Sequence, residues 1–199
     1  MNGIARSTAI LLSTIALGLG AAGCSGSVVN MRPATAVNSA AAPNDSVVVF
    51  MRPSGAAFGI QSEVYEVPDG QPGRLIGIVA AKKKVAYRTT PGDHLFMVIG
   101  ESADFMQARL EPGRVYYALV TPRMGMWKAR FSLKPVHVAD RGDLGGWQQG
   151  TEWVEMDESS GRWAAENAAD IESKRAKYLP EWIGKPPTDR PVLVPEDGQ

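Results

Sequence analysis

Alternation of apolar and polar side chains is clearest in residues 106–110 and 127–133. In both segments the apolar residues share one face of an extended chain, which is typical of a strand with one face on a core and one in water. Residues 46–51 are instead apolar without interruption, which favours a strand covered on both faces. Pro53 prevents that strand from continuing as a central strand.

Turn chemistry separates the β-rich segments. Thr90-Pro91-Gly92-Asp93 and Glu111-Pro112-Gly113-Arg114 both place proline where φ is preset and glycine where a positive φ is needed. The expected strands lie near residues 46–51, 58–67, 74–79, 85–89, 94–99, 106–110, 116–120 and 127–133. Residues 46–138 are therefore predicted to form a mainly β domain, an antiparallel β-sandwich or small barrel of seven or eight strands.

Residues 139–183 are expected to combine a Gly-rich irregular segment, 139–155, with one α-helix from Trp163 to Leu179. Ser159 and Ser160 are N-cap candidates, and Pro180 should end the helix because the residue before proline disfavours helical geometry. The narrow apolar stripe of this helix favours docking on the parent domain, with recruitment of a partner as the alternative. Its members are Ala164, Ala168, Ile171 and Tyr178.

Residues 184–199 contain four prolines and are predicted to form an extended tail without a core of its own. Residues 192–194 could add a strand to a sheet edge, in this chain or in another protein. Simple disorder is the alternative.

Residues 1–23 have the pattern of a secretory signal, with Arg6 ahead of an apolar run and small residues leading to Cys24. The apolar run is short for a spanning helix, which needs about 20 residues, so an uncleaved anchor is the less favoured alternative. The small residues before Cys24 resemble the bacterial lipobox, with Ala21 where leucine is usual. That resemblance implies acylation of Cys24 and a stable lipid anchor. An ordinary thiol is the alternative reading of Cys24.

Residues 24–45 are rich in Ser, Ala, Asn and Pro and show no apolar periodicity. They are predicted to form a flexible tether between the lipid and the domain. In lipoproteins of Gram-negative bacteria, an aspartate after the acylated cysteine usually signals retention in the inner membrane. Ser25 therefore implies the outer membrane, with the domain facing the periplasm.

Composition narrows the function classes. The 21 basic and 21 acidic side chains balance, so no electrostatic footprint for nucleic acid is present. One cysteine and two histidines rule out a Cys-based metal cluster or a multi-histidine metal site. No Gly-rich phosphate loop opens a helix, and no cofactor is expected.

Candidate catalytic chemistry is sparse. Asp93 and His94 are adjacent, so on a strand their side chains point to opposite faces and do not cooperate directly. No Gly-x-Ser-x-Gly elbow is present. We therefore predict no enzymatic activity, with His94 as a turn-flanking residue and His137 as a satisfied structural histidine.

Recognition could involve a basic run or a tryptophan. Lys82-Lys83-Lys84 could contact lipid headgroups or an acidic partner, but a solvated edge or hairpin loop is favoured. Among the five tryptophans, Trp127 together with Arg123 is the preferred recognition site, because tryptophan is enriched at interfaces.

The order of these motifs resembles a bacterial domain-of-unknown-function family, made up mostly of envelope lipoproteins. The motifs that carry the likeness are Val49-Phe50-Met51-Arg52-Pro53, Pro91-Gly92-Asp93-His94-Leu95-Phe96, Glu111-Pro112-Gly113-Arg114-Val115-Tyr116-Tyr117 and Arg123-Met124-Gly125-Met126-Trp127. The resemblance implies a β-sandwich akin to carboxypeptidase-regulatory and PEGA-type domains over residues 46–138. It carries over no catalytic residue.

The sequence thus predicts a lipid-anchored envelope protein with a non-catalytic binding or scaffolding domain and a possible protein partner. A small apolar-ligand carrier would instead show a closed pocket of about 300 Å³ or more inside the sandwich. An envelope hydrolase, the least favoured alternative, would need a cleft in which His94 or a carboxylate meets a nucleophile.

Overall fold

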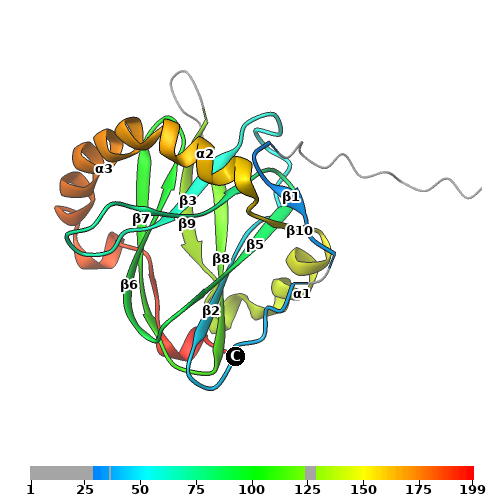
Figure 1. Cartoon of the computed structure of the whole chain (residues 1–199). Coiled ribbons are helices and arrows are strands. Elements are labelled where there is room, and N and C mark those ends of the chain that lie inside the picture. The colour runs from blue at the N-terminus through cyan, green and yellow to red at the C-terminus, as the bar shows by residue number, and fades with distance from the viewer. Residues whose placement is uncertain (1–28, 36, 124–128) are drawn as a thin grey trace, which may run out of the picture.

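The computed structural model describes residues 29–35, 37–123 and 129–199, and these form a mainly β domain (Figure 1). One sheet has the order β1 (Arg32–Pro33), β10 (Glu152–Glu155), β5 (Lys83–Thr89), β2 (Ser46–Arg52), β8 (Arg114–Arg123) and β9 (Arg130–Pro135). The other has the order β11 (Val192–Leu193), β7 (Ala103–Leu110), β6 (Gly92–Ile99), β3 (Ser62–Glu66) and β4 (Arg74–Val79). The helices are α1 (Arg141–Gln149), α2 (Glu158–Glu166) and α3 (Ala168–Ile183), with 3-10 turns at Val138–Asp140, Pro187–Asp189 and Pro195–Asp197. The predicted mainly β class is confirmed.

The prediction of a wholly antiparallel array of seven or eight strands is wrong. Eleven strands form within the described residues, and the pairs β2–β8, β5–β10 and β7–β11 are parallel. The strands expected between residues 46 and 133 are all present, although β9 begins at Arg130 and residues 127–128 lie outside the described part of the chain. The additional strands β1, β10 and β11 come from the segments that flank the predicted domain.

The core lies between the two sheets. Phe50 of β2 and Phe96 of β6 meet edge to face at 5.2 Å between ring centroids, and both are fully buried. The other face of β2 is covered by α1, where Val47 and Val49 pack with Leu144. All seven residues of β2 are buried, which confirms the strand covered on both faces.

The predicted single helix is two helices. Asp157, rather than a serine, caps α2 by accepting hydrogen bonds from the backbone N–H groups of Ser159 and Ser160. The expected end at Pro180 is wrong, because α3 continues to Ile183. Beyond Pro180 the helix buries Trp182, whose ring lies 5.9 Å from that of Phe105 in β7. This packing offsets the backbone penalty of an internal proline.

Helix α3 docks on the outer face of the second sheet, the favoured alternative, although within the predicted stripe Ala168 is exposed and Ala164 belongs to α2. Ile171 and Trp182 are its buried residues, and they pack with Tyr65, Met97 and Phe105. The segment predicted to be irregular, 139–155, instead contains α1 and β10. None of the described helices is both long and apolar enough to cross a membrane.

Residues 29–35 and 37–45 of the expected tether are described, and some of them are fixed to the domain. Met31 is 6% exposed and lies in the core between the sheets, and its sulfur accepts a hydrogen bond from the Ile78 amide. Arg32 pairs with Glu155 across β1 and β10. A flexible tether over this whole segment is therefore incorrect, because apolar burial and strand pairing hold residues that carry no periodic pattern.

The C-terminal tail is also ordered. It adds β11 to the edge strand β7, with Leu193 fully buried, so strand addition occurs within this chain and the tail is not disordered. The buried Asp197 carboxylate accepts hydrogen bonds from the amides of Val138 and Val194 and contacts His137 Nδ1 at 2.9 Å. His137 therefore fixes the tail, which agrees with a structural role.

Candidate functional site

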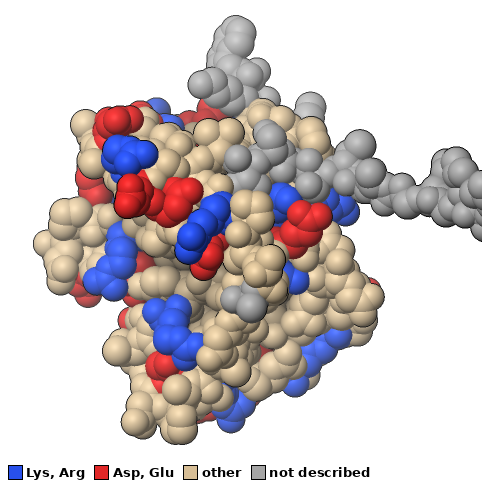
Figure 2. All heavy atoms as spheres, turned by 45° about the vertical axis from the view of Figure 1, so that its right-hand side comes forward, with Lys and Arg blue, Asp and Glu red and all other residues tan. Residues whose placement is uncertain are grey.

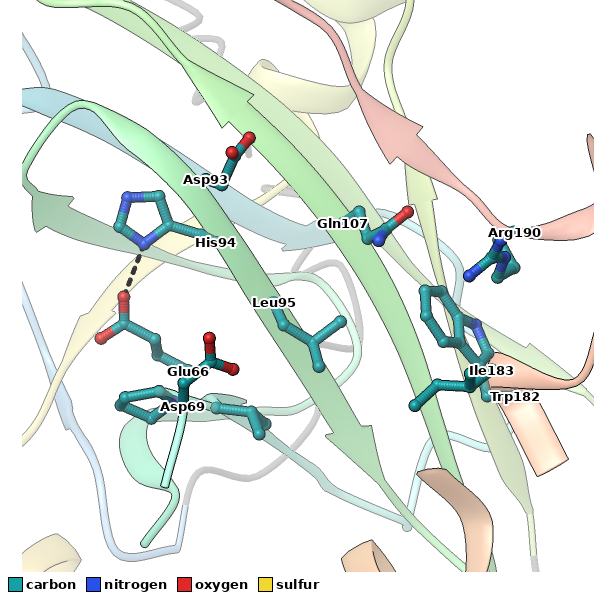
Figure 3. A pocket seen from close by; sticks show the side chains of 11 residues that line it. Glu66, Asp69, Asp93, His94, Leu95, Gln107, Trp182, Ile183 and Arg190 are labelled. Atoms are coloured by element: carbon teal, nitrogen blue, oxygen red, sulfur yellow. Dashed lines mark hydrogen bonds and ion pairs between the residues drawn. The ribbon is translucent and has the colours of Figure 1, made fainter. Parts of the chain in front are cut away.

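A groove of about 620 Å³ opens beside the end of the second sheet where β6 begins (Figure 3). Strands β6 and β7, the loop after β3, the end of α3 and the start of the tail form its walls. Its lining comprises Glu66, Val67, Pro68, Asp69, Asp93, His94, Leu95, Gln107, Trp182, Ile183 and Arg190. Five segments of the chain thus build one surface.

One wall of the groove is a closed polar network centred on Glu66, which we call the Glu66 wall. Glu66 Oε1 lies 2.7 Å from His94 Nδ1, and Glu66 Oε2 accepts a hydrogen bond of 2.6 Å from the Tyr87 hydroxyl. Arg74 adds an ion pair with Glu66 Oε2 at 3.4 Å and donates to Tyr87 Oη at 3.3 Å. Burial and the Glu66 carboxylate raise the pKa of Tyr87. Tyr87 belongs to β5, so this network joins the two sheets.

His94 has no nitrogen available for proton transfer. Nδ1 faces the Glu66 carboxylate, and Nε2 lies 2.8 Å from the carbonyl oxygen of Thr90. Both ring nitrogens are therefore already engaged by groups of the fold. A general base needs a free ring nitrogen beside the proton that it removes. The geometry therefore fits a structural histidine, stacked parallel to Phe96.

Asp93 does not join this network. Its side chain is 88% exposed and lies 3.7 Å from Arg109 Nε. The argument from adjacency is thus confirmed, since Asp93 and His94 point apart. The carboxylate partner of His94 is Glu66, 28 residues away.

The opposite wall, formed by Trp182 and Arg190, contains polar atoms without partners. We call it the Trp182 wall. Trp182 is 3% exposed, yet its indole Nε1 has no hydrogen-bond acceptor, and neither does the buried Nε of Arg190. The Arg190 guanidinium lies 5.6 Å from the Trp182 ring centroid and makes no ion pair with a described carboxylate. Buried donors without acceptors are rare and costly, so such a cluster needs an explanation.

Between the two walls the lining is partly apolar, and Asp69 and Gln107 also belong to it. Leu95 lies between His94 and Trp182 in Figure 3, and Val67, Pro68 and Ile183 complete this surface. A cation and an indole N–H at one end of an apolar floor suit an anionic group attached to an apolar body.

The residues that the sequence singled out lie elsewhere. Arg123 ends β8 and pairs with Asp104 at 3.3 Å, and Asp104 also lies 3.7 Å from Lys185. Trp127 and Cys24 lie outside the described residues, so the Arg123–Trp127 pair stays a prediction. The sequence reasoning missed Glu66, Trp182 and Arg190. A tryptophan two residues after Pro180 was the available signal for Trp182.

The favoured reading of the lysine run is wrong for two of its residues. Lys83 and Lys84 are each only 6% exposed. Lys83 Nζ pairs with Glu152, and Lys84 Nζ donates to the Gln148 carbonyl oxygen and lies 4.6 Å from the Trp153 ring centroid. Burial lowers the pKa of Lys84. Because β10 covers β5, these lysines are not at a sheet edge.

A second, smaller cleft of about 270 Å³ lies at the other end of β3, beside α2 and α3. Glu63 lines it together with Asp170 and Lys174. Burial raises the pKa of Glu63 to about 7, its own backbone amide and Lys174 oppose the rise, and Asp170 adds to it. Among the described residues, no three His, Asp or Glu side chains are grouped as metal ligands would be.

Neither a scan against models of known protein families nor a search of curated proteins found a match to this chain. The resemblance to envelope lipoproteins therefore stays a prediction from the quoted motifs.

Proposed function

We propose that this protein is a non-catalytic binding module of the bacterial cell envelope. Acyl chains on Cys24 hold it at the outer membrane, and its two sheets act as a β-sandwich scaffold facing the periplasm. The groove between the Glu66 wall and the Trp182 wall takes the ligand. The observation that supports the proposal most is the pair of buried, unpartnered donors at Trp182 Nε1 and Arg190 Nε.

These donors favour a ligand with an anionic group. A carboxylate or phosphate oxygen near Trp182 Nε1 and the Arg190 guanidinium would accept from both and compensate the arginine charge. The apolar floor at Leu95 and Ile183 would receive the attached body. A short peptide with a free C-terminal carboxylate has this chemistry, and so does an alkyl phosphate.

The alternative functions have less support. In a hydrolase, His94 would have to activate a nucleophile, whereas both of its nitrogens contact Glu66 and the Thr90 carbonyl. An apolar-ligand carrier would need space between the sheets, whereas Phe50, Phe96 and Phe131 fill the core there. The groove is open and has polar ends, which suits selective binding of an amphipathic ligand.

Binding is tested with the mature lipidated chain in detergent, using the peptide acetyl-Leu-Ala as free acid and as C-terminal amide, and dodecyl phosphate as a second probe. The indole N–H signals of uniformly ¹⁵N-labelled protein report contact, and Trp182→Phe assigns the Trp182 signal. We expect at least one anionic probe to shift this signal, with the amide binding about tenfold more weakly than the acid, a difference of about 1.4 kcal/mol.

Arg190→Met should remove this discrimination, because the Arg190 guanidinium is the positive charge on the Trp182 wall that attracts an anionic group. Arg109→Met is the matched control, since Arg109 is 73% exposed and does not line the groove. Equal affinities of acid and amide for the unaltered protein would contradict the proposed ligand class. No response of the Trp182 signal to any probe would contradict the groove itself.

The lipid anchor has its own test. Cys24→Ser should abolish incorporation of an acyl label and move the protein from the membrane to the soluble fraction of cells. Retained acyl label and unchanged partition in that variant would remove the anchor from the proposal.

A further inference from the structure

The first described residues of the chain are fixed to the domain. Asn30 accepts a hydrogen bond from the Ser160 hydroxyl through its carbonyl oxygen, Met31 is buried in the core, and Arg32 pairs with Glu155. The chain therefore enters the domain at a defined point, beside the start of α2. Only residues before Val29 can act as a tether.

We propose that the end of the domain that carries the start of β1 and the loop between β2 and β3 lies against the bilayer, with the groove facing away from it. This inference rests on the proposed acylation of Cys24. Val29 is the fifth residue after Cys24, and five fully extended residue steps span at most about 18 Å. A free tether up to Asp45 would span roughly 75 Å.

The short spacing restricts how the domain can turn. A compact domain of about 170 residues has a radius of gyration near 15 Å, and hence a diameter of about 40 Å. A tether of about 18 Å is less than half of this, so it cannot carry the opposite end of the domain to the lipid headgroups. The entry point at Val29 must stay near the membrane surface.

The surface at this end suits lipid contact. Val29, Phe58 and Ile60 are large apolar residues that are 56%, 43% and 38% exposed. In Figure 1 the loop between β2 and β3 and the start of β1 lie at the same end of the molecule. An exposed aromatic ring near the headgroups gains free energy by inserting its apolar part.

This loop is held by a buried cation rather than by a core. Arg52 is fully buried and donates to the carbonyl oxygens of Ala56, Ala57 and Ile60 at 2.6–2.7 Å. Its guanidinium also lies 4.8 Å from the Phe131 ring centroid. Burial lowers the pKa of Arg52 to about 10, which leaves it charged at neutral pH. Phe58 is thus presented on a loop that is fixed on both sides.

Charge does not provide the attraction. Figure 2 brings the β1 side of the molecule forward, and Lys and Arg side chains are interspersed there with Asp and Glu. The whole chain has equal numbers of basic and acidic side chains. The lipid on Cys24 and the exposed apolar residues would therefore hold this end, and added salt should have little effect.

The groove lies at the other end of the strands. Ser46 at the start of β2 pairs with Thr89, close to the turn that leads to His94. Arg52 ends β2 at the other end, where the loop between β2 and β3, which contains Phe58, begins. A strand of seven residues spans about 20 Å. With this loop on the bilayer and β2 roughly along the membrane normal, the groove opens about that far from the headgroups and receives its ligand from the aqueous side.

The chain offers a direct test, because Cys24 is its only cysteine and acylation consumes the thiol. A cysteine introduced by Phe58→Cys can therefore be labelled alone with an environment-sensitive fluorophore. Asp93→Cys is the matched control, since Asp93 is 88% exposed and lies at the groove end. Each lipidated variant is placed in vesicles of phosphatidylethanolamine and phosphatidylglycerol that contain nitroxide-labelled lipids.

We expect the label at position 58 to be quenched at least threefold more strongly than the label at position 93, in low and in high salt. Insertion of about 20 Gly and Ser residues after Ser27 should reduce this difference, because a long flexible linker lets the domain turn. Equal quenching at the two positions in protein that carries the acyl label and floats with the vesicles overturns the orientation alone. Loss of both acyl label and flotation overturns the lipid anchor and the orientation together.

Discussion

The two walls of the groove differ in how completely their polar atoms are satisfied. On the Glu66 wall, each carboxylate oxygen accepts from at least one donor and both nitrogens of His94 face acceptors. On the Trp182 wall, the indole Nε1 and the Arg190 Nε are buried without partners. A polar group that the fold has already satisfied contributes to stability, whereas an unsatisfied one can gain free energy from a ligand.

The wall that looks functional by its residue types is therefore not the wall that we expect to bind the ligand. The acid–histidine pair on the Glu66 wall looks like catalytic machinery, yet its geometry is that of a clamp between the two sheets. The Trp182 wall has no catalytic residue type in a familiar arrangement, but it provides the groove's unpartnered donors. Variants of each wall, measured for both unfolding free energy and ligand binding, therefore test this difference.

The largest effect is expected from Glu66→Leu. This change leaves His94, Tyr87 and Arg74 without their shared acceptor, and two of these groups are largely buried. We expect the free energy of unfolding to fall by about 3–4 kcal/mol. Urea denaturation of the mature chain, with binding of the anionic probes measured in parallel, checks this value.

The control for this change is Asp93→Leu, at a neighbouring carboxylate that is 88% exposed. Its unfolding free energy should stay within about 0.5 kcal/mol of the unaltered protein. If Glu66→Leu has an effect as small as this control, the Glu66 wall is not a clamp, and its role in binding has to be reconsidered.

A smaller effect is expected from Asp197→Ala, which affects the Trp182 wall indirectly through the C-terminal tail. Asp197 fastens the tail that carries Arg190 and β11, and its loss leaves the amides of Val138 and Val194 without an acceptor. We expect a loss of about 2 kcal/mol and faster hydrogen exchange at the β11–β7 pairing. The exposed neighbour variant Glu196→Ala should change neither. Unchanged exchange in Asp197→Ala would show that Leu193 burial alone holds the tail.

Local chemistry was enough to place most strands. The glycines of both predicted Pro-Gly turns have positive φ, 129° at Gly92 and 73° at Gly113, as the turn argument requires. The uninterrupted apolar run at β2 is covered on both faces because α1 packs on the side away from the core. The turns and the apolar run are each contained in a few neighbouring residues, so the sequence predicts them, although the helix that covers β2 lies far along the chain.

The features that the sequence did not predict depend on residues far apart in the chain. Lys83 and Lys84 look solvated, but Glu152 and Gln148, more than 60 residues away, allow them to be buried. Strands of two to four residues, such as β11 and β10, are too short to show a period. The structural role of Glu66 likewise depends on His94 and Tyr87, which are 28 and 21 residues away, and no local motif predicts it.

The smallest effect concerns Glu63, three residues before Glu66 on β3 but outside the polar network. Burial raises its pKa to about 7, from an ordinary value of 4.5. The folded chain therefore keeps a proton that the unfolded chain releases between about pH 4.5 and pH 7. The free energy of unfolding contributed by this group falls as the pH rises through that range and is lost above it.

Glu63→Gln keeps the side chain neutral at every pH, so it should remove this loss. The variant should equal the unaltered protein near pH 4.5 and be more stable by about 1–2 kcal/mol at pH 8. Asp69→Asn, at an exposed carboxylate, should show no such pH-dependent gain. A constant difference between Glu63→Gln and the unaltered protein from pH 4.5 to 8 would mean that Glu63 is ionised throughout. In that case β3 would carry two compensated carboxylates, and compensation would no longer distinguish Glu66.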